Sequence, residues 1–116
     1  MNKVILVGNL TADPDVRATP AGLYVAKLRV ATNEYAGKDD GGEAKRYSEF
    51  HSVVAFGKLA EFAGTHLRKG RSITVEGRLK TSSWEDAASG VKKYRTEVVA
   101  DKLEFAGAKP HETAAA

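Results

Sequence analysis

The sequence predicts an all-β domain in which five strands form a small barrel and one helix lies between the third and the fourth strand. Short segments whose residues alternate between apolar and polar predict strands that are half exposed to solvent. One segment, residues 58–69, changes to the three- and four-residue apolar spacing of an amphipathic helix. Glycines and turn-forming residues separate the segments, and a chain of 116 residues has room for one domain.

The first half of the chain predicts two strands and two loops. Four consecutive apolar residues that precede a glycine predict a buried strand at Lys3–Gly8. Asn9–Gly22 contains two prolines and is expected to be an ordered loop. Tyr24–Thr32 alternates and predicts a half-exposed strand. The three glycines and two aspartates of Asn33–Glu43 predict a long, mobile hairpin loop.

The second half predicts the helix and three further strands. In Tyr47–Phe56, a period of two places Phe50 and Phe56 on one face and His51 on the other. Gly70 is expected to end the helix, whose last turn carries basic residues. The last two strands are expected on either side of a turn-rich tip, at Arg71–Lys80 and Lys93–Phe105.

Five strands with one helix between the third and the fourth is the order of an OB-fold barrel. The predicted OB-fold domain covers residues 1–106, and the small and polar residues 107–116 predict a short disordered tail. Within the fourth strand, alternation directs Leu79 inward and Arg71 outward, and Trp84 is expected just beyond the strand.

The composition excludes several classes of protein. The chain has no cysteine, which excludes disulfides, thiol catalysis and thiolate metal sites. Its first apolar run, Val4 to Val7, is too short for a signal peptide or a membrane span, so we expect a cytoplasmic protein without membrane association. Eighteen Lys and Arg against fifteen Asp and Glu leave a net charge of +3, which is weak support for a nucleic-acid partner.

Four aromatic residues lie in or beside the predicted strands, each within a few residues of Lys or Arg: Tyr35, Phe50, Phe56 and Trp84. A flat ring accepts the face of any base while neighbouring cations attract phosphates, which is how proteins bind single strands without reading their sequence. Burial in the core is nevertheless the usual position of an aromatic residue in a strand. The joint pattern of rings and cations predicts a stacking surface, on condition that the rings are exposed.

We predict neither a catalytic site nor a metal site, and we expect no cofactor. The carboxylates are scattered along the chain, and no nucleophile stands beside a base. The histidines, His51, His66 and His111, lie on separate elements without the spacing of metal ligands. The acidic residues near Asp39 fit no calcium loop, and Gly8 lacks the further glycines of a dinucleotide-binding turn. We therefore expect a protein that is not an enzyme.

Five segments match one family in the right order: Asn2–Leu10, Asp13–Arg17, Phe56–Glu61, Leu67–Gly70 and Val75–Leu79. On these motifs the chain resembles the bacterial single-stranded DNA-binding proteins, from about Met1 to Phe105. The resemblance implies an OB fold, usually assembled as a homotetramer, around which single-stranded DNA wraps in replication, recombination and repair. It also implies a location in the cytoplasm, at the nucleoid.

The resemblance assigns roles to single residues. The family's base-stacking positions fall on Tyr35, Phe50, Phe56 and Trp84, and because relatives commonly carry tryptophan at the first two, we expect somewhat weaker binding here. A position that resembles a subunit-contact histidine falls on His51. The family's phosphate contacts fall on six lysines: Lys3, Lys38, Lys45, Lys58, Lys69 and Lys80.

The chain departs from its relatives in two places. Ser52, Ser82 and Ser83 stand where relatives often carry Arg or Lys, which predicts a flatter salt dependence of binding. Relatives usually append an acidic tail that recruits other proteins, whereas this chain ends with Glu112, Thr113 and three alanines. Recruitment through an acidic tail is therefore not expected.

Together these observations predict a protein that coats single-stranded DNA without sequence specificity and performs no chemistry. Duplex DNA is expected to bind poorly, because its bases are already stacked on one another. Two alternatives stay open. One is an OB module of primosomal type, with protein partners and modest nucleic-acid affinity, which the three serines and the smaller rings leave possible. The other is an RNA-binding OB domain, which only the family motifs disfavour.

Overall fold

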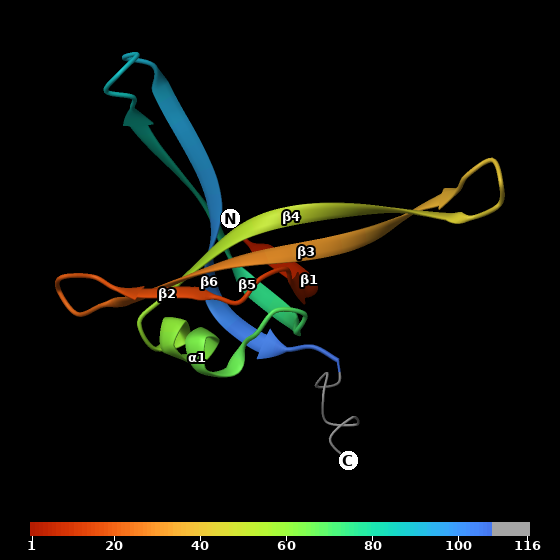
Figure 1. Cartoon of the computed structure of the whole chain (residues 1–116), viewed down its shortest axis with the longest axis horizontal. Helices are drawn as coiled ribbons and strands as arrows, with labels where there is room; N and C mark the ends of the chain where they lie inside the picture. The colour runs from red at the N-terminus through yellow and green to blue at the C-terminus, as the bar shows by residue number, and fades with distance from the viewer. Residues whose placement is uncertain (108–116) are drawn as a thin grey trace.

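The computed structural model describes residues 1–107, which form one continuous sheet and one helix (Figure 1). The elements in chain order are β1 (Val4–Leu10), β2 (Asp15–Ala18), β3 (Tyr24–Lys38), β4 (Ala44–Phe56), α1 (Lys58–His66), β5 (Ser72–Glu85) and β6 (Lys92–Phe105). The tail predicted at residues 107–116 lies outside the described residues, apart from Gly107. Within residues 1–107, no helix has the length and apolar character that crossing a membrane requires.

The sheet closes into a barrel because β1 pairs with two strands. The strands follow the order β1, β5, β6, β4, β3, β2, and β1 also pairs with β3 through Asn9 opposite Ala31 and Leu10 opposite Val30. The pairing of β4 with β6 is parallel, and the others are antiparallel. Five long strands make the barrel, and α1 lies between the third and the fourth of them, β4 and β5. The predicted OB-like fold is confirmed.

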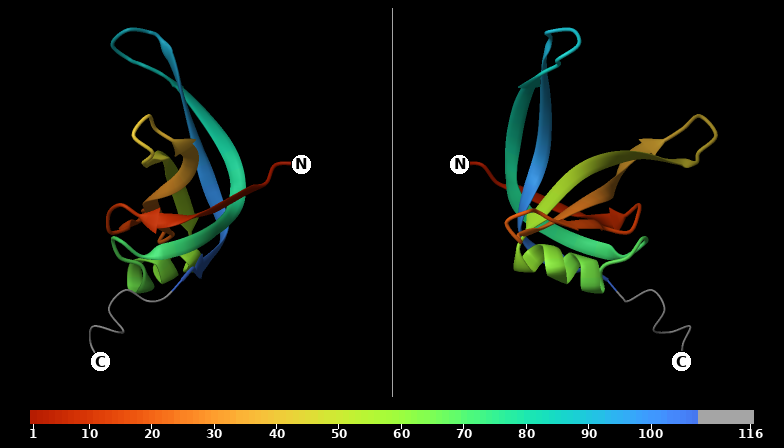
Figure 2. Two further views of the ribbon diagram at one scale, coloured as in Figure 1. Left: turned by 90° about the vertical axis from the view of Figure 1, so that its right-hand side faces the viewer. Right: turned by 60° about the vertical axis from the view of Figure 1, so that its left-hand side comes forward.

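The hydrophobic core fills the barrel, and α1 covers one of its ends (Figure 2). Along β3, alternate residues from Ala26 to Val30 are buried, whereas Lys27 and Arg29 between them are exposed. Ala60 and Ala63 of α1 are fully buried, and their small side chains let the helix lie close to the strands. The apolar inner face of the sheet therefore holds the barrel together and leaves its outer face free for polar and aromatic side chains.

Two long hairpins extend from the barrel on the side away from α1 (Figures 1 and 2). We call them the β3–β4 arm and the β5–β6 arm. The turn of the β3–β4 arm closes on Asp39, whose carboxylate accepts hydrogen bonds from the backbone N–H groups of Gly41 (2.9 Å) and Glu43 (3.0 Å). In the β5–β6 arm, Asp86 accepts a hydrogen bond from the N–H of Ala88 (2.9 Å).

The strands are longer than the sequence predicted. β3 continues to Lys38, through most of the segment expected to be a mobile loop, and β2 occupies part of the loop expected at residues 9–22. Trp84 lies inside β5 rather than beyond it. Most residues of the arms are exposed on both faces, so the apolar alternation that marks a half-buried strand is absent there.

Candidate nucleic-acid interface

The four predicted stacking rings are all exposed to solvent. The exposed fraction is 58% for Tyr35, 56% for Phe50, and 44% for both Phe56 and Trp84. None of the four belongs to the hydrophobic core cluster. The interpretation of these rings as core residues, which the sequence left open, is therefore wrong.

Three of the rings share one face of the sheet. Residues that lie directly opposite each other on paired strands point to the same face, and so do alternate residues of one strand. Phe50 lies opposite Ala31, Phe56 opposite Val25, and Tyr35 opposite Arg46. The three rings therefore lie on the outer face of the sheet along β3 and β4.

Trp84 lies on the same face, although it belongs to the other arm. Val54 of β4 lies opposite Val99 of β6, and Val99 lies opposite Arg78 of β5. Trp84 follows Arg78 by an even number of residues along β5, without a register shift between them. The pairing across β6 therefore places Trp84 on the same face of the sheet as Phe56. We call this outer surface of β3, β4, β6 and β5 the ring-bearing face.

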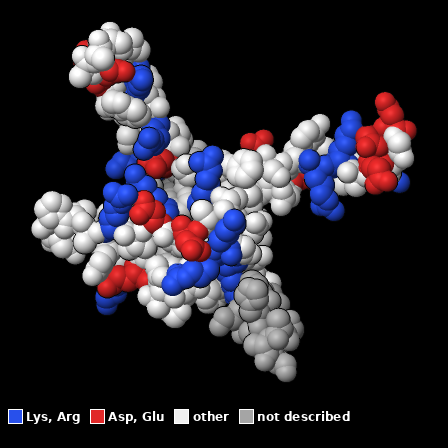
Figure 3. Space-filling model, in the orientation of Figure 1, with Lys and Arg blue, Asp and Glu red and all other residues white. Residues whose placement is uncertain are grey.

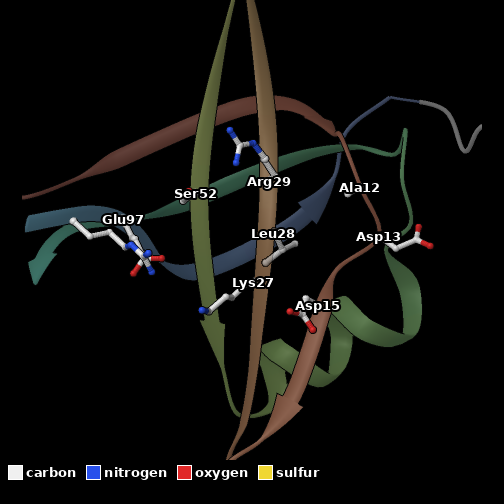
Figure 4. A pocket seen from close by; sticks show the side chains of 9 residues that line it. Ala12, Asp13, Asp15, Lys27, Leu28, Arg29, Ser52 and Glu97 are labelled. Carbon is white, nitrogen blue, oxygen red and sulfur yellow. The ribbon is translucent and has the colours of Figure 1, made fainter. Parts of the chain in front are cut away.

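A groove of about 370 Å³ lies on the ring-bearing face, at the base of the two arms (Figure 4). Figure 4 shows Lys27 and Arg29 on β3, with Ser52 beside them on β4. The charged residues that line the groove are three cations and three carboxylates: Lys27, Arg29, Arg95, Asp13, Asp15 and Glu97. The groove therefore joins residues of the β3–β4 arm to residues of the β5–β6 arm.

Two cations of the groove lie beside the rings. The guanidinium carbon of Arg29 is 5.8 Å from the ring centroid of Phe50, and that of Arg95 is 5.6 Å from the ring centroid of Trp84. At exposed sites such cation–π contacts contribute about 0.5–1 kcal/mol each. Each arm thus pairs an exposed ring with a cation, which is the arrangement that holds a base by its face and a phosphate by its charge.

Most cations of residues 1–107, including Lys27, Arg29 and Arg95 of the groove, take part in no ion pair. Within residues 1–107, the cations in ion pairs are Lys3, Arg17, Arg78, Lys93 and Lys102. The pair with Lys3 lowers the pKa of the Glu76 carboxyl, chiefly through the hydrogen bond between them. Figure 3 shows cations gathered at the base of the arms and along the β3–β4 arm, and carboxylates at the tip of that arm.

A family model described as the single-strand binding protein family matches residues 1–106 of the chain. The chain belongs to this family. Its members are DNA-binding proteins and not enzymes, so the resemblance and the non-enzymatic function predicted from the sequence are confirmed.

Named relatives agree with the family assignment. The chain is 44% identical over 109 residues to single-stranded DNA-binding protein 1 of Chlorobaculum tepidum, a match that covers 94% of this chain and 67% of the relative. It is similar to a solved complex of the Plasmodium falciparum protein of this family with single-stranded DNA, with 28% identity, a TM-score of 0.80, and 92% and 96% of the two chains covered.

A second solved structure extends beyond this chain. The single-stranded DNA-binding protein of Thermus aquaticus, solved as a deletion mutant, is 37% identical with a TM-score of 0.78. The match covers 92% of this chain but 51% of the Thermus chain. The chain described here thus spans about half the length of that relative.

The lysines assigned from the single-strand binding protein family do not all lie near the rings. Alternation places Lys38 and Lys80 on the ring-bearing face and Lys45 on the reverse face of the β3–β4 arm. Lys58 is the first residue of α1, two positions after Phe56. Proximity to the rings thus favours Lys38, Lys58 and Lys80, whose contacts with phosphates stay predictions.

The remaining two lysines have partners of their own. The backbone N–H of Lys69, in the loop before β5, donates to the carboxylate of Asp13 at 2.8 Å. The ammonium of Lys3 is bonded to Glu76, which lies opposite Ile5 of β1. A phosphate contact at Lys3 would share the ammonium with Glu76 or compete with it.

His51, the residue with the predicted subunit contact, is half-buried at the inner end of the β3–β4 arm. Its Nε2 atom is 2.9 Å from the hydroxyl oxygen of Thr32. It lies opposite Val30 and therefore faces away from Phe50, as alternation predicted. Its role at a contact between subunits stays a prediction.

The sequence did not single out Lys27, Arg29 and Arg95 as site residues. Lys27 and Arg29 lie in the half-exposed strand predicted at Tyr24–Thr32, and Arg95 lies in the strand predicted at Lys93–Phe105, but the strand that lies opposite each of them was unknown. The parity of residues along β4 would have indicated the ring-bearing face, because Arg29 lies opposite Ser52, two residues from Phe50.

Proposed function

We infer that residues 1–106 bind single-stranded DNA without reading its sequence and protect it in replication, recombination and repair. Bases stack on Tyr35, Phe50, Phe56 and Trp84, while neighbouring cations hold the phosphates. The observation that carries this function is that four rings of β3, β4 and β5 are exposed on one face of one sheet. Proteins bury most of their large rings, so four on one outer face indicate a surface made for flat ligands.

Stacking on a ring requires a base whose face is free. Each base stacked on an aromatic ring contributes about 1–3 kcal/mol, and any base can stack because every base has a π face. The bases of a duplex are already stacked on one another. The ring-bearing face therefore selects single strands over duplexes and discriminates little among sequences.

The protein acts in the cytoplasm, at the nucleoid, as a homotetramer. Two features of β1 support the assembly. Ile5 and Val7 on its outer face have exposed fractions of 63% and 62%, which is high for large apolar side chains. Within residues 1–107, β1 pairs with β3 only through Asn9 and Leu10, so Val4–Gly8 has one strand edge open for another strand.

Trp84 is the only tryptophan of the chain and reports directly on the proposed site. Oligo(dT) should quench its fluorescence because a base stacks on the ring, whereas duplex DNA should quench it weakly. The titrations are run with oligo(dT), oligo(U) and duplex DNA at two salt concentrations. Equal responses to all three, or no response to oligo(dT), would reject the function. A stronger response to oligo(U) than to oligo(dT) would indicate an RNA-binding protein instead.

The variant Trp84→Ala tests the role of the ring. The loss of one stacked base should weaken binding by about 1–3 kcal/mol, which is roughly 5- to 150-fold, and leave thermal unfolding unchanged. Binding is measured by the anisotropy of a labelled oligo(dT). The control is Tyr94→Ala, because Tyr94 is an exposed ring of the same arm that lies opposite Ser83 and therefore on the reverse face. A similar loss in both variants would contradict the assigned face.

A further inference from the structure

Three cations at the base of the arms lack acidic partners although carboxylates line the same groove. Lys27, Arg29 and Arg95 line it together, and none of them takes part in an ion pair within residues 1–107. Exposed cations usually gain little from ion pairs, so the absence of one is ordinary for a single residue. Together, however, the three cations give one groove a set of charged N–H donors from β3 and β6 that an anionic ligand can bind.

Two of the carboxylates of the groove are engaged away from these cations. An oxygen of Asp15 lies 3.3 Å from Nε of Arg17, and Asp13 accepts a hydrogen bond from the backbone N–H of Lys69. Figure 4 shows both aspartates on the side of the groove formed by β2 and the loop before it, away from Ser52. The stretch of the groove along β3 therefore carries Lys27 and Arg29, while β6 contributes Arg95 together with the third carboxylate, Glu97.

The two arginines also lie directly opposite two of the serines that replace basic residues of the relatives. Arg29 of β3 is opposite Ser52 of β4, and Ser82 of β5 is opposite Arg95 of β6. The Cβ atoms of opposite residues are about 4.5–5.5 Å apart, and both side chains of such a pair point to the same face. The positive charge absent from each serine is thus present one strand away, still on the ring-bearing face.

We propose that Lys27, Arg29 and Arg95 bind the phosphates of the DNA strand where it passes from Phe50 on one arm to Trp84 on the other. This inference rests on the proposed function and extends it. The groove joins the two pairs of ring and guanidinium, Arg29 with Phe50 and Arg95 with Trp84, so that both arms hold one continuous strand. It also replaces the expectation of a flattened salt dependence, since the charges at Ser52 and Ser82 are relocated rather than lost.

The salt dependence of binding tests this site, because each phosphate contact with a single strand contributes about 0.7 to the slope of log K against log salt concentration. Arg29→Gln and Arg95→Gln should each reduce the slope by about 0.7, and the double variant by about twice that. Arg29→Lys and Arg95→Lys should keep the wild-type slope because they keep the charge. Binding is measured with an oligo(dT) long enough to reach both arms.

The matched control is Lys92→Gln, which removes one charge from the same arm as Arg95. Lys92 lies opposite Glu85, on the face that carries Tyr94. The slope of log K against log salt concentration for Lys92→Gln should therefore equal that of the wild type. If wild-type protein binds oligo(dT) but the Gln variants of Arg29 and Arg95 behave like Lys92→Gln, the groove site is wrong while the proposed function stands. If the wild type fails to bind oligo(dT), the proposed function itself fails.

Discussion

Arg71 is a buried arginine, with an exposed fraction of 8%. Its Nε and Nη1 atoms have no hydrogen-bond partner within the described residues, and its guanidinium carbon lies 4.2 Å from the ring centroid of Phe105. Contact with a ring offsets only part of the cost of burying polar N–H groups without partners. Arg71 therefore contributes little to stability, in contrast to Arg68, whose Nη1 donates to the carbonyl oxygens of Gly64 and Leu67 at 2.7 Å.

We predict opposite effects for Arg71→Met and Arg68→Met. The first should raise the free energy of unfolding by about 1 kcal/mol, because an apolar side chain in place of a buried, unsatisfied charge is neutral or stabilising. The second should lower it by about 1 kcal/mol, because it removes two hydrogen bonds at the end of α1. Urea denaturation of both variants measures the difference. A loss of stability in Arg71→Met equal to that in Arg68→Met would show that Arg71 has a partner.

Arg71 and Leu79, which the sequence placed in one predicted strand, point the other way from the prediction. Alternation along residues 71–80 directed Arg71 outward, but β5 begins at Ser72, and the N–H of Arg71 belongs to a turn in which it donates to the carbonyl of Arg68. Leu79 was directed inward and is exposed, because β5 has left the barrel for the arm at that point. Alternation therefore predicts burial only where the strand lies over the core.

Among the elements, β1 and β5 approach their neighbours most closely at glycines. A Cβ atom at Gly8 would lie 2.1 Å from the carbonyl oxygen of Ala31, and one at Gly77 would lie 2.1 Å from that of Val99. Both contacts are with backbone, which cannot rotate away as a side chain can. Gly8 lies beside the two residue pairs that join β1 to β3, so the closure of the barrel depends on its missing side chain.

The variant Gly8→Ala should therefore destabilise the barrel, by about 3 kcal/mol, because the added methyl group forces β1 away from β3. Chemical denaturation measures the loss. The control is Gly41→Ala in the turn of the β3–β4 arm, where the nearest atom is an oxygen of the Asp39 side chain at 3.5 Å. That variant should retain wild-type stability. If Gly8→Ala were equally stable, the close pairing of β1 with β3 would be wrong.

For the molecule as a whole, the order of the elements was predictable and the length of the arms was not. The period of two identified β3 to β6 where one face is buried, and the period of the helix identified α1, although α1 ends at His66 rather than just before Gly70. A continuous apolar run identified β1, but the prediction that this strand is buried was wrong, because Ile5 and Val7 are exposed. In the arms both faces are exposed, so residues such as Lys38 and Ala44 carry no apolar pattern, and their strands are maintained by pairing with each other. Glycines and aspartates marked the turn but not where the strands begin to pair.

The candidate site was predictable to a similar extent. The rings could be proposed from their residue types and the nearby cations, because stacking needs only a flat exposed surface. The groove could not be proposed, because it depends on which residues of distant strands lie side by side. Arg95 and Arg29 are 66 positions apart in the numbering of the chain, and only the pairing of β4 with β6 brings their strands together.

The outer face of β1 supports a prediction about assembly. Light scattering of the wild type should give a mass of about four times the 12.4 kDa of one chain. Val7→Arg should reduce it, because a charge in an apolar contact between subunits would be buried without a partner. The control is Val91→Arg, an exposed apolar residue at the tip of the β5–β6 arm. A wild-type mass near that of one chain would refute the assembly.

The pairing between the two arms is short. β4 and β6 are joined through two residue pairs, Val53 with Val98 and Val54 with Val99, and beyond them the arms separate. Within residues 1–107, β4 and β6 have no other residue pairs with each other. A DNA strand bound to rings of both arms would therefore add a second connection between them, outside the barrel.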